Sequence, residues 1–131
     1  MAVITVNRVR IRRWWTIPKF AFVIAMICRQ VRRTPGCLDF RIYRTTGLAV
    51  WTVTAWVDEE SLLAFRDSGA HGRAGVYKTR WFDEASIARW HQATPSLPDR
   101  EEAAQKLLEL GRLSEVCFPS SAQARGEIVV T

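Results

Sequence analysis

Few side chains in this chain could take a direct part in a reaction, and His71 and Asn7 are the strongest candidates. His71 follows a predicted helix, where a neutral imidazole would serve as a general base or as an axial ligand of haem iron. Asn7 lies in the middle of a predicted strand, where its amide would donate to a substrate carbonyl or to dioxygen. The structural alternatives are a histidine bonded to a helix end and an asparagine that bridges backbone groups.

A second group of candidates is aromatic, because six tryptophans occur among 131 residues. Trp51 and Trp56 point to opposite faces of one predicted strand, so one should be core while the other lines a pocket and stacks on a flat ligand. Trp14 and Trp15 lie in a predicted linker beside arginines. They would form a lid over an aromatic ligand or, equally, part of a dimer contact.

Arg41 and Tyr43 share one face of another predicted strand and are weaker candidates for orienting a phenolate. No dinucleotide, phosphate-loop, zinc-protease or nucleophile-elbow motif occurs. With only two histidines, a multi-histidine metal site is excluded, and no metal is predicted.

The three cysteines are odd in number and widely spaced, which argues against disulfides and zinc fingers and favours a reducing, cytoplasmic setting.

The net charge of +6 is unevenly distributed, with eight cations and no acid before Asp39. Such a segment could attract nucleic acid, anionic lipid or an acidic ligand, or simply form a solvated rim. Nucleic acid is disfavoured because no Lys/Arg-Gly-Phe-type motif lies on a central strand.

The apolar run at residues 20–28 is too short for the ~20 residues that span a bilayer. Peripheral membrane contact stays open, because Phe22 and Met26 lie off the main apolar face.

Hydrophobic periodicity predicts alternating strands and helices. The predicted strands are Ala2–Ile11, Cys37–Thr45, Leu48–Val57, Ala85–Gln92 and a short Leu113–Phe118. The predicted helices are Pro18–Arg33, one that Asp58 caps and that ends near Gly69, a short piece through about Lys78, and one from Asp99 to Leu110.

This order predicts an α+β fold of the ferredoxin-like βαββαβ type, with an antiparallel sheet and an extra C-terminal helix. We expect one domain over residues 1–119 and a loose tail over 120–131. The helices should cover one face of the sheet. The other face is too apolar to stay wet, so we expect a second subunit or a ligand to cover it.

Three stretches resemble a known family: Asn7 on the first strand, the run Thr52–Glu59, and the run Ala64–His71. Over roughly residues 2–92 they are similar to the dimeric α/β-barrel superfamily, in particular the antibiotic-biosynthesis-monooxygenase type with its DUF3291 and spheroidene-monooxygenase-like relatives. The helix after Pro98 resembles the extension of the DUF3291-like members.

The resemblance implies a homodimer whose sheets pack into a barrel. It also implies either cofactor-free oxidation of aromatic polyketides by dioxygen, or haem binding and degradation. Asn7 matches the first-strand asparagine of the haem-degrading enzymes, whose pocket tryptophan aligns with Phe65. Their axial histidine falls at Gly75, whereas the histidine here is His71, about one helical turn earlier.

The predicted function is therefore a small oxidoreductase, a cofactor-independent monooxygenase acting on a planar aromatic or polyene substrate. Asn7 would polarise the substrate and His71 would transfer a proton. The predicted substrate contacts are Trp14, Trp15, Trp51, Trp56, Phe65, Arg41 and Tyr43. The alternatives are a haem-binding variant with His71 as ligand and a non-catalytic dimeric binding protein.

Overall fold

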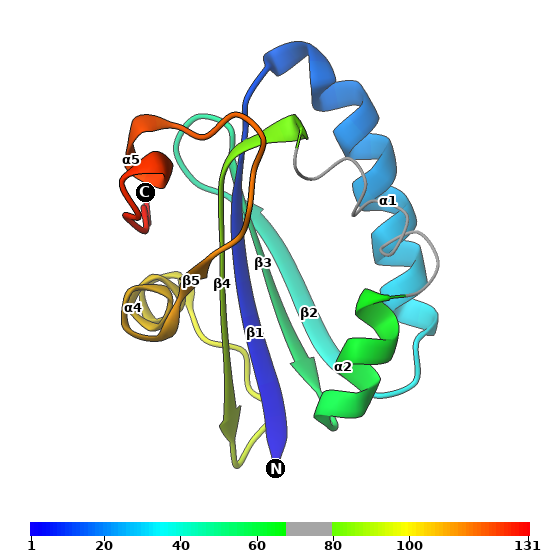
Figure 1. Cartoon of the computed structure of the whole chain (residues 1–131). Helices are drawn as coiled ribbons and strands as arrows, with labels where there is room; N and C mark the ends of the chain where they lie inside the picture. The colour runs from blue at the N-terminus through cyan, green and yellow to red at the C-terminus, as the bar shows by residue number, and fades with distance from the viewer. Residues whose placement is uncertain (68–79) are drawn as a thin grey trace.

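The computed structural model of this protein describes residues 1–67 and 80–131. A five-stranded antiparallel sheet in the order β2-β3-β1-β4-β5 forms its centre (Figure 1). The strands are β1 (Ala2–Ile11), β2 (Cys37–Arg44), β3 (Ala49–Trp56), β4 (Phe82–Gln92) and β5 (Arg112–Leu113). The helices are η1 (Trp14–Thr16), α1 (Ile17–Arg33), α2 (Glu59–Arg66), α4 (Arg100–Leu110) and α5 (Ser121–Ala124). This arrangement confirms the predicted α+β, ferredoxin-like fold.

The sheet separates two helical layers, with α1 and α2 on one side and α4 with the C-terminal segment on the other (Figure 1). Period-two alternation assigns each strand residue to one of these sides. On β1, Thr5 and Asn7 face the side of α1 and α2, whereas Ile4, Val6 and Arg8 face α4. The central strand therefore contributes to two separate cores.

The face for which the sequence predicted a second subunit or a ligand is covered by the chain itself. Ala103 and Leu107, one helical turn apart on α4, are fully buried against it. Ile128 and Val130 pack on the same cluster. Residues 120–131, predicted as a loose tail, thus contain α5 and add apolar side chains to this core.

The predicted start of the fourth strand at Ala85 is wrong, because β4 begins at Phe82. Asp83 and Glu84 belong to the start of this strand, and β1 supplies their partners. Arg10 makes two hydrogen bonds to the Asp83 carboxylate, and Arg8 lies 2.9 Å from Glu84. Cross-strand charge pairs of this kind offset the low strand propensity of acidic residues.

The predicted strand Leu113–Phe118 is also too long, since β5 holds only Arg112 and Leu113. Gln123 satisfies the backbone beyond it, because its side-chain amide donates to the Ser114 carbonyl at 2.8 Å. The short helix predicted through Lys78 lies outside the described residues.

Gly36, which joins α1 to β2, provides a first stability test. Its φ is +94°, and a Cβ there would collide with the side chain of Ser61. We expect Gly36→Ala to lower the free energy of unfolding by about 2–4 kcal/mol, because backbone strain and overpacking add. Gly47 is the matched control, with a φ of +61° and nothing within 4 Å of the position that a Cβ would take, so Gly47→Ala should cost about 1 kcal/mol. Equal losses in urea denaturation would contradict the packing argument.

Candidate functional site

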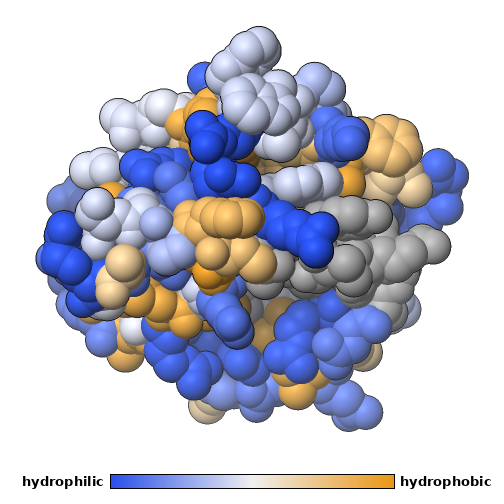
Figure 2. Space-filling model, turned by 45° about the horizontal axis from the view of Figure 1, so that its top comes forward, coloured by the Kyte–Doolittle hydropathy of each residue, from blue (hydrophilic) through white to orange (hydrophobic). Residues whose placement is uncertain are grey.

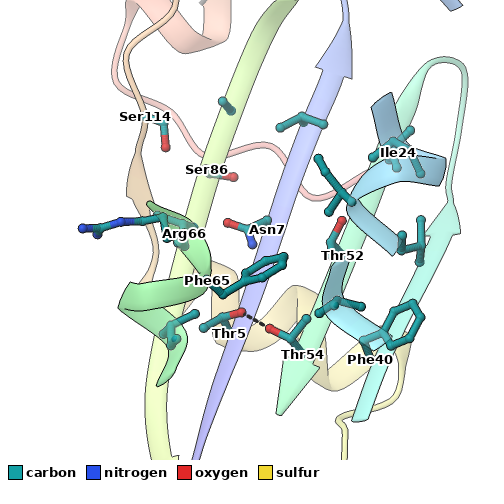
Figure 3. Close-up of a pocket in the computed structure, with 18 of the residues that line it drawn as sticks. Thr5, Asn7, Ile24, Phe40, Thr52, Thr54, Phe65, Arg66, Ser86 and Ser114 are labelled. Carbon is teal, nitrogen blue, oxygen red and sulfur yellow. Dashed lines mark hydrogen bonds between the residues drawn. The ribbon is translucent and has the colours of Figure 1, made fainter. Parts of the chain in front are cut away.

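A cavity of about 400 Å³ lies between the sheet and the layer formed by α1 and α2 (Figure 3). Helix α1 is amphipathic, and its inner face lines one side of this cavity. The apolar lining residues of this helix are Phe20, Val23, Ile24, Ile27 and Val31. Leu62, Leu63 and Phe65 of α2 add further apolar surface. Such a lining suits a mostly hydrophobic ligand.

The sheet contributes a row of polar side chains to the same cavity. Thr5 and Asn7 come from β1, while Thr52 and Thr54 come from β3. Asn7 is directly paired with Thr52 on one side and with Ile87 of β4 on the other. Because directly opposed residues share a face, Asn7 and Thr52 lie next to each other in the middle of the sheet.

One end of this polar row satisfies its own hydrogen bonds. The hydroxyls of Thr5 and Thr54 are hydrogen-bonded to each other (Figure 3). The indole Nε1 of Trp56 donates to Thr54 Oγ1 at 2.9 Å. These three buried side chains therefore have partners within the protein and are part of the structure of the cavity wall.

Asn7 and Thr52 differ from Thr5, Thr54 and Trp56 in their hydrogen bonding. Both are half-buried, and neither side chain makes a hydrogen bond to another residue in the described ranges 1–67 and 80–131. Figure 3 shows the Asn7 amide and the Thr52 hydroxyl pointing into the cavity. An amide offers two donors and an acceptor, and a hydroxyl offers one donor. The arrangement presents donors to an oxygen atom of a bound molecule.

Two aromatic rings close the end of the cavity near Thr54. Trp56 and Phe65 have ring centroids 5.2 Å apart with a tilt of 38°, and both line the cavity. The structure thus brings together Asn7, Trp56 and Phe65 from the predicted site. Their role in ligand binding remains a prediction.

Trp51, Tyr43 and Arg41 lie on the other face of the sheet and are separated from the cavity by it. Tyr43 is paired with Trp51 across β2 and β3, and their rings stack with centroids 5.9 Å apart. Arg41 donates to the Pro98 carbonyl at 3.2 Å. The sequence could show that Trp51 and Trp56 face opposite ways, but not which of the two faces carries the cavity.

The buried Tyr43 hydroxyl gives a second stability test. It has no hydrogen-bond partner among the described residues, and burial raises the pKa of this phenol, against the lowering effect of Arg100 and Arg41. Tyr43→Phe should leave the free energy of unfolding unchanged or raise it by about 1 kcal/mol. Thr54→Val removes a buried hydroxyl that has partners, so it should cost about 1–3 kcal/mol. Urea denaturation of both variants checks this, and a large loss in Tyr43→Phe would contradict it.

Trp14 and Trp15 do not line the cavity. Their side chains are 70% and 58% exposed, and their rings meet edge to face with centroids 5.9 Å apart. They form no lid over the described part of the cavity. His71 lies outside the described residues, so its predicted role is carried forward as a prediction.

Several polar residues that line the cavity were not predicted as site residues, among them Thr52, Ser86, Arg66 and Arg89. Arg89 is held by Glu59 of α2, with 2.6 Å between Nη1 and Oε1. The sequence signal for Thr52 was its spacing of two residues from Thr54, which places both threonines on one face of the predicted strand. No comparable signal marks Arg66, because only the tertiary fold brings α2 over the sheet.

Cys28 is the thiol that faces the cavity. Burial raises the pKa of this thiol, while nearby Arg32 lowers it to a lesser degree. It therefore stays protonated at neutral pH, where a thiol is a poor nucleophile. Within residues 1–67 and 80–131, no three His, Cys, Asp or Glu side chains group as metal ligands would.

Comparison with known proteins gives a family match and structural neighbours. The family model described as antibiotic biosynthesis monooxygenase matches residues 19–77. No curated protein sequence matches the chain significantly.

Three solved structures illustrate the similarity of fold. A putative antibiotic biosynthesis monooxygenase from Nitrosomonas europaea is 14% identical, with 72% of this chain and 93% of that chain covered and a TM-score of 0.64. The protein Rv0793 from Mycobacterium tuberculosis is 16% identical, with coverages of 72% and 97% and a TM-score of 0.63. A mutant of SnoaB, a cofactor-independent oxygenase from Streptomyces nogalater, is 15% identical, with coverages of 72% and 98% and a TM-score of 0.59. The family match over residues 19–77, together with this shared fold, confirms the predicted resemblance to the antibiotic biosynthesis monooxygenase family.

Proposed function

We propose that this protein is a monooxygenase-type oxidoreductase that oxidises a planar aromatic or polyene substrate with dioxygen and without a bound cofactor. The observation that carries the proposal is the apolar cavity whose wall holds the Asn7 amide and the Thr52 hydroxyl, neither of which is hydrogen-bonded to another described residue. The family match supports oxygenase chemistry, and one structural neighbour is described as a cofactor-independent oxygenase.

In this proposal the ring system of the substrate lies between the inner face of α1 and the sheet. A carbonyl or phenol oxygen of the substrate accepts hydrogen bonds from Asn7 Nδ2 and Thr52 Oγ1. These bonds stabilise the enolate or phenolate that forms when the substrate loses a proton, as donors aimed at developing negative charge do. We assign the proton transfer to His71, as the sequence predicted.

The substrate anion supplies the electrons that reduce dioxygen, so no external reductant is consumed. For an activated methylene group, one electron passes to O2, the two radicals combine, and the resulting hydroperoxide loses water. The balance is CH2 plus O2 giving C=O plus H2O. The two C–H bonds break, one oxygen atom enters the substrate, and the other leaves as water.

An oxygen electrode tests this proposal. Purified protein is supplied with tricyclic aromatic ketones that carry an activated methylene, with hydroxylated naphthalenes, and with a conjugated polyene. We expect oxygen uptake above the rate of heat-denatured protein, equimolar with product, and insensitive to chelator and to added flavin or nicotinamide. Uptake that never exceeds the protein-free rate across this panel would contradict the proposal.

A hemin titration separates this proposal from its haem-binding alternative. None of the described residues that line the cavity is a histidine, while His71 lies outside the described ranges. We expect no saturable Soret shift. A shift that saturates at one haem per chain and disappears in His71→Ala would replace the cofactor-free proposal by the haem-binding one.

We also propose that the protein is a homodimer, as the family resemblance implies. Because α4 and the C-terminal segment cover the second face of the sheet, the contact would use another surface, or this segment would have to move. Light scattering of the purified chain measures the state, and a monomer at all accessible concentrations would contradict the proposal.

A further inference from the structure

The segment formed by η1 and the outer face of α1 exposes four large apolar side chains. Trp14 and Trp15 in η1 are joined by Phe22 and Met26 on the outer face of α1, and Phe22 is 68% exposed. Figure 2, in which the top of Figure 1 comes forward, shows hydrophobic side chains scattered among hydrophilic ones on this face. We call these four side chains the apolar patch. Exposed apolar side chains that lie along one segment suit an interaction site.

The apolar patch lies among unpaired cations. Phe22, Met26, Arg29 and Arg33 follow the spacing of one helix face, and all four are exposed. Lys19 lies on the same side of α1, and Arg12 and Arg13 flank the two tryptophans. None of these five cations forms an ion pair with a carboxylate among the described residues. Residues 1–38 contain no acid at all.

This charge decides which kind of partner fits. A second copy of the chain would bring the same unpaired cations against themselves, which costs free energy. An anionic surface would gain from the exposed ones, Arg13, Lys19, Arg29 and Arg33, whereas Arg12 is half-buried with its guanidinium over the ring of Phe118. Exposed Trp and Phe side chains next to Arg and Lys on an amphipathic helix suit the interface of a bilayer, where the rings enter the headgroup region and the cations meet lipid phosphates.

We propose that η1 and the outer face of α1 bind the surface of a membrane that contains anionic phospholipid. The contact is peripheral, since within residues 1–67 and 80–131 no helix is long and apolar enough to cross a bilayer. The same helix lines the cavity with its inner face, through Phe20, Ile24 and Ile27. Membrane binding would therefore place the cavity one helix diameter from the apolar molecules dissolved in that membrane. The binding itself does not depend on the proposed oxygenase activity.

Vesicle sedimentation with the full chain tests the proposal. Phosphatidylcholine vesicles are compared with vesicles that also contain phosphatidylglycerol, at low and high salt. We expect binding that requires phosphatidylglycerol and weakens as salt rises. Exchange of Arg13, Lys19 and Arg29 for Gln should lower the partition coefficient about 10²-fold, because each cation near an anionic surface contributes about fivefold. Exchange of Trp14 and Trp15 for Ser should lower it about tenfold or more, because buried apolar area is lost.

The matched control is Leu108→Ser. Leu108 is 57% exposed on α4, in the opposite helical layer, so its exchange should leave vesicle binding unchanged. Equal binding to both kinds of vesicle, or none to either, overturns the proposal.

Two further outcomes also overturn it. If vesicles do not bind but a single-stranded RNA does, with a steep salt dependence, the surface is a nucleic-acid site. If the double exchange of Trp14 and Trp15 turns a dimer into a monomer and vesicles do not bind, the apolar patch is a contact between copies.

Discussion

Replacing Arg8 by methionine should lower the free energy of unfolding by about 3 kcal/mol, because the buried Glu84 carboxylate then keeps only a longer ion contact, 3.5 Å, with the partly exposed Arg10. The two side chains are only 3% and 6% exposed, and 2.9 Å separates Arg8 Nη1 from Glu84 Oε1. The substitution also removes two hydrogen bonds to the C-terminal segment. Arg8 also donates from Nε and Nη2 to the carbonyl of Thr131, at 3.1 and 3.0 Å. Urea denaturation measures the loss of stability. Hydrogen exchange of residues 120–131 measures the effect of losing the two hydrogen bonds.

Two variants separate the buried charge from simple loss of packing. Arg8→Met combined with Glu84→Met should recover most of the lost stability, since no charge is then left in the core. Arg125→Gln breaks an ion pair between exposed side chains, Arg125 and Glu127, and should leave stability unchanged. If Arg8→Met were as mild as Arg125→Gln, the buried pair would have no special role.

Replacing Asn7 by leucine should lower kcat of the proposed oxidation by about 10²–10³-fold, the usual effect of removing one donor from a developing oxyanion. Leucine is close to asparagine in size, so the cavity keeps its shape. The Asn7 amide makes no hydrogen bond to another described residue, so the free energy of unfolding should not fall. Steady-state kinetics on the best substrate from the oxygen-uptake panel, together with urea denaturation, measures both effects.

Gln105→Leu is the matched control for Asn7→Leu. It also replaces a carboxamide by an apolar side chain, but on the exposed side of α4, where Gln105 donates to Glu109 at 3.0 Å. Its kcat should equal that of the unchanged protein. A normal kcat in Asn7→Leu would remove Asn7 from the mechanism. A loss of both kcat and stability would assign it a structural role instead.

Asn7 could be placed in the fold from the local sequence pattern, whereas Glu84 could not. The alternation on Ala2–Ile11 placed Asn7 on one face of a strand, and a polar residue on an apolar face is a signal that sequence alone carries. Asp83 and Glu84 were left outside the predicted strand, and their partners, Arg10 and Arg8, lie more than seventy positions away in the chain. Local propensity contains no information about such partners, and the strand start at Phe82 was missed for this reason.

The order of the main strands and helices, and the two faces of each strand, could be predicted from the sequence, because side-chain periodicity is a property of the local backbone. The sequence also indicated a resemblance to the antibiotic biosynthesis monooxygenase family, whose model matches residues 19–77. What packs against each face of the sheet became visible in the three-dimensional fold. The inward side of α1 leaves a cavity beside Asn7, Thr52 and Trp56, whereas α4 and the C-terminal segment fill the side of Trp51 and Tyr43. Both faces are apolar, and the choice between them depends on contacts between residues far apart in the chain, which periodicity does not record.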